Sequence, residues 1–140
     1  MREIVTQSAV SKGPDSATPR LLVIDSDSRV GDEVHNILRR GFRVSVLTDA
    51  AAATRLLATA HFDVVLCELR LISDTESALH VMLSSYLHER RLIALTSGGA
   101  LQSGDAGAGI GLHLLEKPIN PERLEQLAAS VVRSFGGETP

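Results

Sequence analysis

Two hydrophobic patterns alternate along the chain between residue 20 and residue 135. Short runs that are apolar throughout are typical of strands covered on both faces. They alternate with longer segments in which apolar residues recur every three to four positions, as in helices with one buried side. The predicted strands are 21–24, 42–47, 62–67, 91–96 and 112–115, and the predicted helices are 28–40, 50–61, 78–88 and one that begins at 120 or 121.

This alternation predicts an α/β fold with a parallel sheet and right-handed crossovers. Five strand–helix units in about 115 residues are typical of an open, doubly wound, flavodoxin-like sheet with strand order 2-1-3-4-5. A closed eight-unit barrel needs about 250 residues and is excluded. The connection 97–111 contains six glycines, which disfavour a helix interior. The fourth helix is therefore expected to be short or disordered.

Residues 1–19 and 136–140 are polar and rich in turn-forming residues, and are predicted to be flexible tails around one domain at 20–135. No secretory signal or membrane-spanning run is recognisable in the sequence. A single cysteine among 140 residues excludes an intramolecular disulfide. These features predict a cytoplasmic protein without membrane association.

The composition also limits the partners that can be considered. Seventeen acidic residues against fourteen Lys and Arg give a net charge of -3, which argues against broad affinity for nucleic acid. The aromatic fraction is 3%, so stacking platforms for bases are not expected. The five histidines are scattered through the sequence and predict no metal cluster.

Polar side chains follow four of the predicted strands at the point where each strand ends. In an open parallel sheet the carboxyl ends of the strands form the edge where ligands bind. Carboxylates there could hold a divalent cation, and a hydroxyl beside a lysine could bind a phosphoryl group. The alternative is that exposed strand ends simply attract polar residues. The residues concerned are Asp25, Ser26, Asp27, Glu68, Thr96, Ser97, Glu116 and Lys117.

These strand ends resemble those of a known family. Residues 21–27 are similar to its opening strand and acidic pair, and 62–71 to the segment that carries its phosphoacceptor aspartate. Residues 95–97 match its strand-four hydroxyl, and 115–118 match its Lys-Pro motif. On these motifs, residues 20–135 resemble the receiver domain of two-component response regulators, the CheY-like superfamily. The resemblance implies a degenerate phosphoacceptor pocket made of Asp25, Ser26, Asp27, Glu68, Thr96 and Lys117.

The chain departs from the family pattern at several of these positions. Glu68 stands at the phosphoacceptor position instead of aspartate, and its extra methylene displaces the carboxylate from in-line attack. Ser26 replaces the second carboxylate of the acidic pair, which leaves Asp25 and Asp27 as weak candidates for magnesium ligands. Ile72, Glu76 and Leu114 replace the expected proline, glycine and aromatic switch residue. No enzymatic activity and no cofactor are therefore expected.

Two interpretations of Glu68 are open at this point. In one, its carboxylate reaches toward Lys117 and the Thr96 hydroxyl and imitates the charge of an aspartyl phosphate. In the other, the site is decayed, and Glu68 pairs with Lys117 and ties the third strand to the fifth. The neighbouring Cys67 lies in an apolar strand and is expected to be a buried small hydrophobic residue.

The sequence thus predicts a stand-alone, atypical pseudo-receiver that acts by protein–protein interaction, as a monomer or homodimer. Its partner would be a histidine kinase, a downstream effector or another signalling protein. The resemblance implies an interaction surface around the fourth helix, fifth strand and fifth helix, which includes Gly98, Gly99 and Leu114. The alternatives are a small-ligand or nucleotide sensor that uses the same cleft, and a conventional phosphorylatable receiver.

Overall fold

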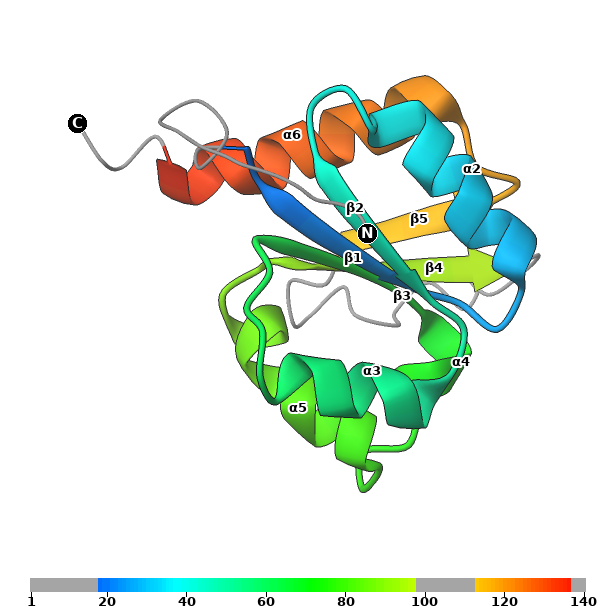
Figure 1. Ribbon diagram of the computed structural model, residues 1–140, viewed down its shortest axis with the longest axis vertical. Helices are drawn as coiled ribbons and strands as arrows, with labels where there is room; N and C mark the ends of the chain where they lie inside the picture. The colour runs from blue at the N-terminus through cyan, green and yellow to red at the C-terminus, as the bar shows by residue number, and fades with distance from the viewer. Residues whose placement is uncertain (1–17, 98–112, 137–140) are drawn as a thin grey trace.

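Five parallel strands form the centre of the protein (Figure 1). The structure is a computed structural model that describes residues 18–97 and 113–136. The strands form one sheet in the order β2-β1-β3-β4-β5, so the predicted fold class and strand order are confirmed. The described elements, in chain order, are β1 (Arg20–Ile24), α2 (Ser28–Leu38), β2 (Arg43–Leu47), α3 (Ala50–Leu57), β3 (Val64–Glu68), α4 (Leu69–Ile72), α5 (Ala78–His88), β4 (Leu92–Ser97), β5 (His113–Lys117) and α6 (Pro121–Gly136).

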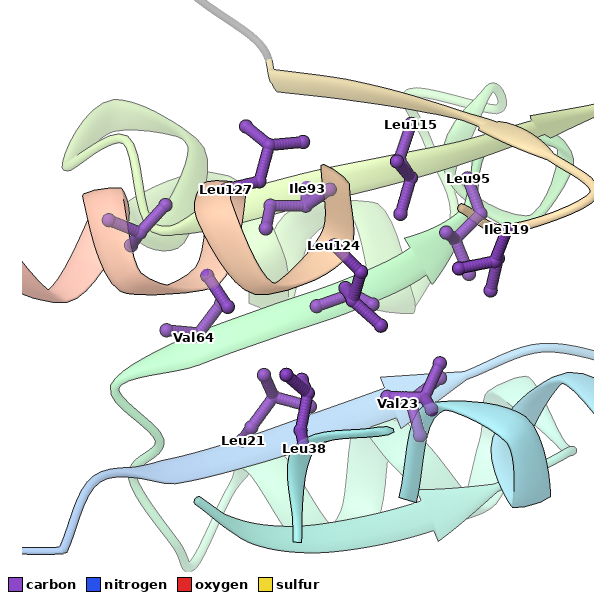
Figure 2. Packing of buried hydrophobic residues seen from close by; sticks show 14 of the residues in the cluster. Leu21, Val23, Leu38, Val64, Ile93, Leu95, Leu115, Ile119, Leu124 and Leu127 are labelled. Carbon is purple, nitrogen blue, oxygen red and sulfur yellow. The ribbon is translucent and has the colours of Figure 1, made fainter. Parts of the chain in front are cut away.

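Helices cover both faces of the sheet, with α2 and α6 on one face and α3, α4 and α5 on the other (Figure 1). Figure 2 shows the hydrophobic cluster on the first face, where Leu124 and Leu127 of α6 pack with strand residues such as Val64 and Ile93. A second cluster on the opposite face includes Phe62, which is fully buried. This double covering explains why the inner strands β1 and β3 are apolar without alternation.

Parallel pairing brings the carboxyl ends of the strands to one edge. Ile24 at the end of β1 is level with Leu47 of β2 and Cys67 of β3. Glu68 at the end of β3 is level with Leu95 of β4. The residues that follow these positions therefore lie at the edge where ligands bind in folds of this kind.

Four of the described helices begin at side chains that cap their first turn. Asp27, Asp49, Ser77 and Asn120 each accept a hydrogen bond from a backbone N–H of α2, α3, α5 and α6, respectively. In α2, Gly31 faces Val46 of β2 so closely that a Cβ atom at this position would overlap the valine side chain. The helix and the strand can approach each other only because residue 31 lacks a side chain.

The observed elements differ from the predicted ones mainly at their ends. The predicted helix 50–61 ends at Leu57. Beyond it, the N–H groups of Ala58 and Thr59 donate to carbonyls three residues back, as in a 3₁₀ turn, and the Thr59 hydroxyl donates to the Leu56 carbonyl. Four residues of α4 follow Glu68 directly, where the hydrophobic pattern predicts a polar connection. The predicted fourth helix and the two predicted tails, apart from Thr18, Pro19 and Gly136, lie outside the described residues. Within the described ranges, no helix has the length and apolarity needed to cross a membrane.

Candidate functional site

The residues that end four strands come together at the carboxyl edge of the sheet. Asp25 follows β1, Glu68 ends β3, Thr96 lies near the end of β4 and Lys117 ends β5. Asp25, Glu68 and Thr96 are buried, although exposed strand ends usually carry solvated polar groups. Buried polar side chains need partners, so their hydrogen bonds define the site.

Asp25 pairs with Lys117 across the ends of two intervening strands. The Lys117 ammonium Nζ donates to Asp25 Oδ2 at 2.9 Å, and the other carboxylate oxygen accepts from the Asp27 backbone N–H at 2.9 Å. The Asp25 side chain is 1% exposed and that of Lys117 18% exposed. A lysine from β5 therefore compensates a carboxylate that follows β1, although β3 and β4 lie between these strands.

Glu68 makes a separate cluster with Ser26 and Arg70. Its Oε1 atom accepts from the Ser26 backbone N–H at 3.1 Å and from the Ser26 hydroxyl at 2.9 Å. Its Oε2 atom accepts from Arg70 Nε at 3.1 Å and from Arg70 Nη2 at 2.8 Å. Arg70 Nη2 also donates to the Ser26 hydroxyl at 3.1 Å, which closes a three-residue network. Four donors fill the four lone-pair sites that a carboxylate offers.

These contacts determine the charge state of Glu68. Burial acts to raise the pKa of this carboxyl, but the hydrogen bonds from Arg70 and Ser26 outweigh burial and hold the pKa below its ordinary value. The Arg70 guanidinium has a correspondingly raised pKa because it donates to Glu68. The pair is therefore ionised, as a carboxylate and a guanidinium, at neutral pH.

Asp27 has a different role from Asp25, although both lie near the end of β1. Its side chain caps α2 by accepting from the Arg29 backbone N–H at 3.0 Å, and it binds the Arg29 guanidinium through Nε and Nη2. Both side chains are open to solvent, at 40% exposed for Asp27 and 89% for Arg29. Hydrogen bonds from the Arg29 side chain and backbone lower the pKa of Asp27.

Thr96 differs from the other buried residues at this edge because its side-chain oxygen makes no hydrogen bond in the described part of the chain. The residue is 2% exposed, and its Oγ1 atom has no hydrogen-bond partner within the described ranges. A hollow of about 330 Å³ lies beside it, between the ends of β3 and β4 and the start of α4. The hollow is lined by Glu68, Leu69, Arg70, Ser73, Leu95, Thr96 and Ser97.

Comparisons with known proteins identify the fold that carries this site. The sequence matches no family model, and no curated protein is similar to it. Solved structures are similar, among them a response regulator receiver domain protein from Clostridium thermocellum, with 18% identity, a TM-score of 0.71, and coverage of 86% of this chain and 99% of that one. This chain has a receiver fold.

Other solved receiver domains give the same result. The receiver domain of a Francisella response regulator is 19% identical, with a TM-score of 0.67 and coverage of 84% of this chain and 98% of that one. The signal receiver domain of an HD domain-containing protein from Pseudomonas fluorescens Pf-5 is 20% identical, with a TM-score of 0.69 and coverage of 85% and 98%. At this level of identity the likeness concerns the fold.

The receiver fold implies a magnesium site, but the donor groups at this edge do not fit one. Both oxygens of Asp25 already accept hydrogen bonds, and Ser26 has a hydroxyl instead of a carboxylate. Asp27 is bound to Arg29, and no group of three His, Cys, Asp or Glu within the described ranges is arranged for a metal ion. Each of the three carboxylates is bound instead by a cationic side chain, in the pairs Asp25–Lys117, Asp27–Arg29 and Glu68–Arg70.

The predicted contact between Glu68 and Lys117 is wrong, and both interpretations of Glu68 assumed it. Lys117 binds the more deeply buried Asp25, and the Glu68 carboxylate is taken by Ser26 and Arg70. Glu68 also makes no hydrogen bond to the Thr96 hydroxyl, which stays unpaired. The nearest donors decide the outcome, because α4 begins directly after Glu68 and brings Arg70 to its carboxylate.

Arg70 is the functional residue that the sequence interpretation missed. Glu68 is the residue just before α4 and Arg70 is the second residue of that helix, so the turn from strand into helix brings the two side chains together. The same spacing separates Asp27 and Arg29, which also pair. Both cations lie in the first turn of a helix, and the pattern of residues at the strand ends does not identify them.

The remaining predicted residues have simpler environments. Cys67 is buried, and burial together with the charges of Glu68 and Asp25 raises the pKa of its thiol to about 12. It therefore stays a neutral, unreactive thiol in the folded protein. Leu114 is half-buried in the edge strand β5. Gly98 and Gly99 of the predicted interaction surface lie outside the described residues.

Proposed function

We propose that this chain is an atypical receiver-like signalling module that acts by protein–protein interaction and is not phosphorylated. The observation that carries the proposal is the saturated carboxylate of Glu68, which accepts four hydrogen bonds from Ser26 and Arg70. Glu68 ends β3, where the family that the sequence resembles carries its phosphoacceptor. A nucleophile needs a free lone pair aligned with the group that it attacks. All four lone-pair sites of Glu68 are taken.

The charge of the site supports the same proposal. In phosphoryl transfer, divalent cations neutralise the developing negative charge. Here Lys117, Arg29 and Arg70 already neutralise the three carboxylates, and the donor set does not fit magnesium. The module we propose therefore has no enzymatic activity and needs no cofactor.

The partner we propose is another signalling protein, such as a histidine kinase or a downstream effector. The receiver fold supports this, because the solved structures that share it include domains of response regulators. Strand β5 is at the edge of the sheet, and helices α6 and α2 cover the same face of the sheet (Figure 1). Together with Leu114 of β5, this region is the surface that we expect the partner to contact.

Phosphodonor treatment followed by intact-mass measurement tests the proposal. The protein and its Glu68→Asp variant are incubated with Mg²⁺ and acetyl phosphate, and each is weighed intact. We expect no phosphoryl adduct on the unmodified chain. A stoichiometric adduct that Glu68→Gln abolishes would overturn the proposal and restore a conventional receiver.

The interaction itself needs a second experiment. The protein is used to capture partners from its native cell, with and without phosphodonor, and bound proteins are identified by mass. We expect one reproducible partner whose recovery is unchanged by the phosphodonor. A recovery that depends on the phosphodonor would contradict phosphorylation-independent binding.

The hollow beside Thr96 favours a second candidate function, a small-ligand or nucleotide sensor. Its volume of about 330 Å³ is at the lower end of the range typical of small-molecule sites. Arg70, Ser73 and Ser97 supply polar groups around it. A saturable rise in melting temperature with a nucleotide would favour this function over the interaction module, because ligand binding stabilises the folded state.

A further inference from the structure

The guanidinium of Arg70 binds both Glu68 and Ser26, so its contacts go beyond those of a simple surface ion pair. Its Nε and Nη2 atoms both donate to Glu68 Oε2, at 3.1 and 2.8 Å, and Nη2 also donates to the Ser26 hydroxyl at 3.1 Å. The Arg70 side chain is 73% exposed, whereas that of Glu68 is 11% exposed. The guanidinium therefore lies on the solvent side of a largely buried carboxylate.

This is the side from which a dissolved cation would approach Glu68. Oxygen atoms of carboxylates and hydroxyls are the ligands of Mg²⁺ and similar hard cations. Glu68 Oε2 and the Ser26 hydroxyl are two such oxygens, and the same nitrogen of Arg70 binds both. A divalent cation at these oxygens would stand next to a fixed positive charge.

We propose that Arg70 is the resident counter-cation of Glu68, a positioning residue that holds the carboxylate and excludes divalent cations from the site. The positive charge that a metal ion would place beside Glu68 is supplied by the Arg70 guanidinium of the chain itself. The role is independent of whether the module acts through a partner protein. It predicts that removal of the guanidinium uncovers a cation-binding carboxylate that the unmodified chain does not present.

Arg29 provides a matched control for this proposal. Arg29 and Asp27 have the same two-residue spacing as Arg70 and Glu68, and their closest contact is 2.9 Å against 2.8 Å. Asp27, however, is 40% exposed and also caps α2. Loss of Arg29 removes one positive charge from the same edge of the sheet but does not free Glu68.

The test is a titration with Mn²⁺ followed by electron paramagnetic resonance, in which bound Mn²⁺ loses its six-line spectrum. The unmodified full chain, Arg70→Gln, Arg70→Ala, Arg29→Gln and the double variant Glu68→Gln/Arg70→Gln are compared at constant ionic strength. We expect the two Arg70 variants to bind one Mn²⁺ at least about tenfold more tightly than the unmodified chain. Repulsion between a dication and a guanidinium about 4 Å away corresponds to that factor or more even in bulk water.

The controls separate this role from a general change of charge. Arg29→Gln is expected to bind Mn²⁺ no more tightly than the unmodified chain, and the double variant is expected to lose the gain. Equal binding by the unmodified chain and the Arg70 variants would overturn the proposal, as would an equal gain in Arg29→Gln. Because Arg70 is largely exposed, its variants are expected to stay folded, and circular dichroism checks this.

A folded Arg70 variant that binds no Mn²⁺ would also overturn the counter-cation role. Tight Mn²⁺ binding by the unmodified chain would do so without any variant. Neither outcome depends on the phosphodonor experiment, which measures a covalent adduct. The failure of this inference and the failure of the proposed function can therefore be told apart.

Discussion

Two carboxylates at the same edge of the sheet are neutralised in different ways. Asp25 is paired with Lys117, which is 92 positions away along the chain, whereas Glu68 is paired with Arg70, two positions away. The Asp25 and Glu68 side chains are both largely buried, at 1% and 11% exposed. Their cations differ, because Lys117 is 18% exposed and Arg70 is 73% exposed.

The difference shows which parts of the site depend on the fold. Lys117 meets Asp25 only when β1, β3, β4 and β5 are assembled in the observed order. Arg70 meets Glu68 through the local turn from β3 into α4. We therefore expect the Asp25–Lys117 pair to report on folding of the whole sheet, and the Glu68–Arg70 pair to report on the local state of the site.

The largest effect is expected from Lys117→Met, which leaves the Asp25 carboxylate buried without its cation. Breaking a buried pair by removal of one partner costs about 3 kcal/mol or more. We expect a loss of about that size in the free energy of unfolding, measured by urea denaturation. The double variant Asp25→Asn/Lys117→Met is the control and should lose less than the sum of the two single variants. A loss below about 1 kcal/mol for Lys117→Met would show that the pair contributes little.

Glu68→Gln is expected to have a smaller effect. The amide keeps an oxygen for Ser26 but presents an NH₂ group to the guanidinium of Arg70, so the charge-assisted hydrogen bonds are lost. Loss of such bonds at a buried group costs about 1 to 2 kcal/mol. Urea denaturation measures this loss, and Asp27→Asn is the matched variant at the exposed pair. Equal losses in the two variants would show that the burial of Glu68 has no bearing on its role.

The stability of the protein is expected to depend on Glu68 in acid. Because the folded-state pKa of Glu68 is lowered, its ionised form stabilises the folded state above the unfolded pKa, near 4.5, and this stabilisation is lost as the pH falls through the folded pKa. The difference in unfolding free energy between the unmodified chain and Glu68→Gln should therefore shrink as the pH falls below about 4.5. A difference that stays constant from pH 7 to pH 3 would contradict the lowered pKa. The pKa of Asp27 is also lowered, but Asp27 is present in both proteins, so the comparison isolates Glu68.

Thr96→Val is expected to have the smallest effect, and with the opposite sign. The Thr96 hydroxyl is buried without a hydrogen-bond partner in the described part of the chain, so its folded state carries a desolvation penalty. Valine has nearly the same shape and removes that penalty. We expect no loss of stability and a gain of up to about 1 kcal/mol in thermal or urea denaturation. A loss of more than about 1 kcal/mol would show that the hydroxyl has a partner in solution.

The fold could be predicted from the sequence because its signal is repeated in every element. Continuous apolar runs at β1, β3 and β4 and one-sided periodicity in α2 and α6 leave few arrangements other than a doubly wound sheet. The limits of the long helices were predicted to within a few residues for the same reason. Helix α4 was missed, because four residues are too few to show a period.

The site was predicted less completely than the fold. The positions of Asp25, Glu68, Thr96 and Lys117 at one edge follow from strand order alone. Their hydrogen-bond partners do not follow from strand order, because they depend on the reach of each side chain and on the local backbone. Arg70 reaches Glu68 from a helix that the pattern did not predict, and Lys117 binds Asp25.

The most direct test of the account is a measurement of the Glu68 pKa by carbon-detected NMR of its side-chain carboxyl, in the unmodified chain and in Arg70→Gln. We infer that the chain's own cation holds this buried carboxylate ionised. We expect a pKa below the ordinary glutamate value in the unmodified chain, because the hydrogen bonds from Arg70 and Ser26 outweigh burial. In Arg70→Gln, where burial remains and the guanidinium is gone, the pKa should rise. An unchanged pKa in Arg70→Gln would contradict the account.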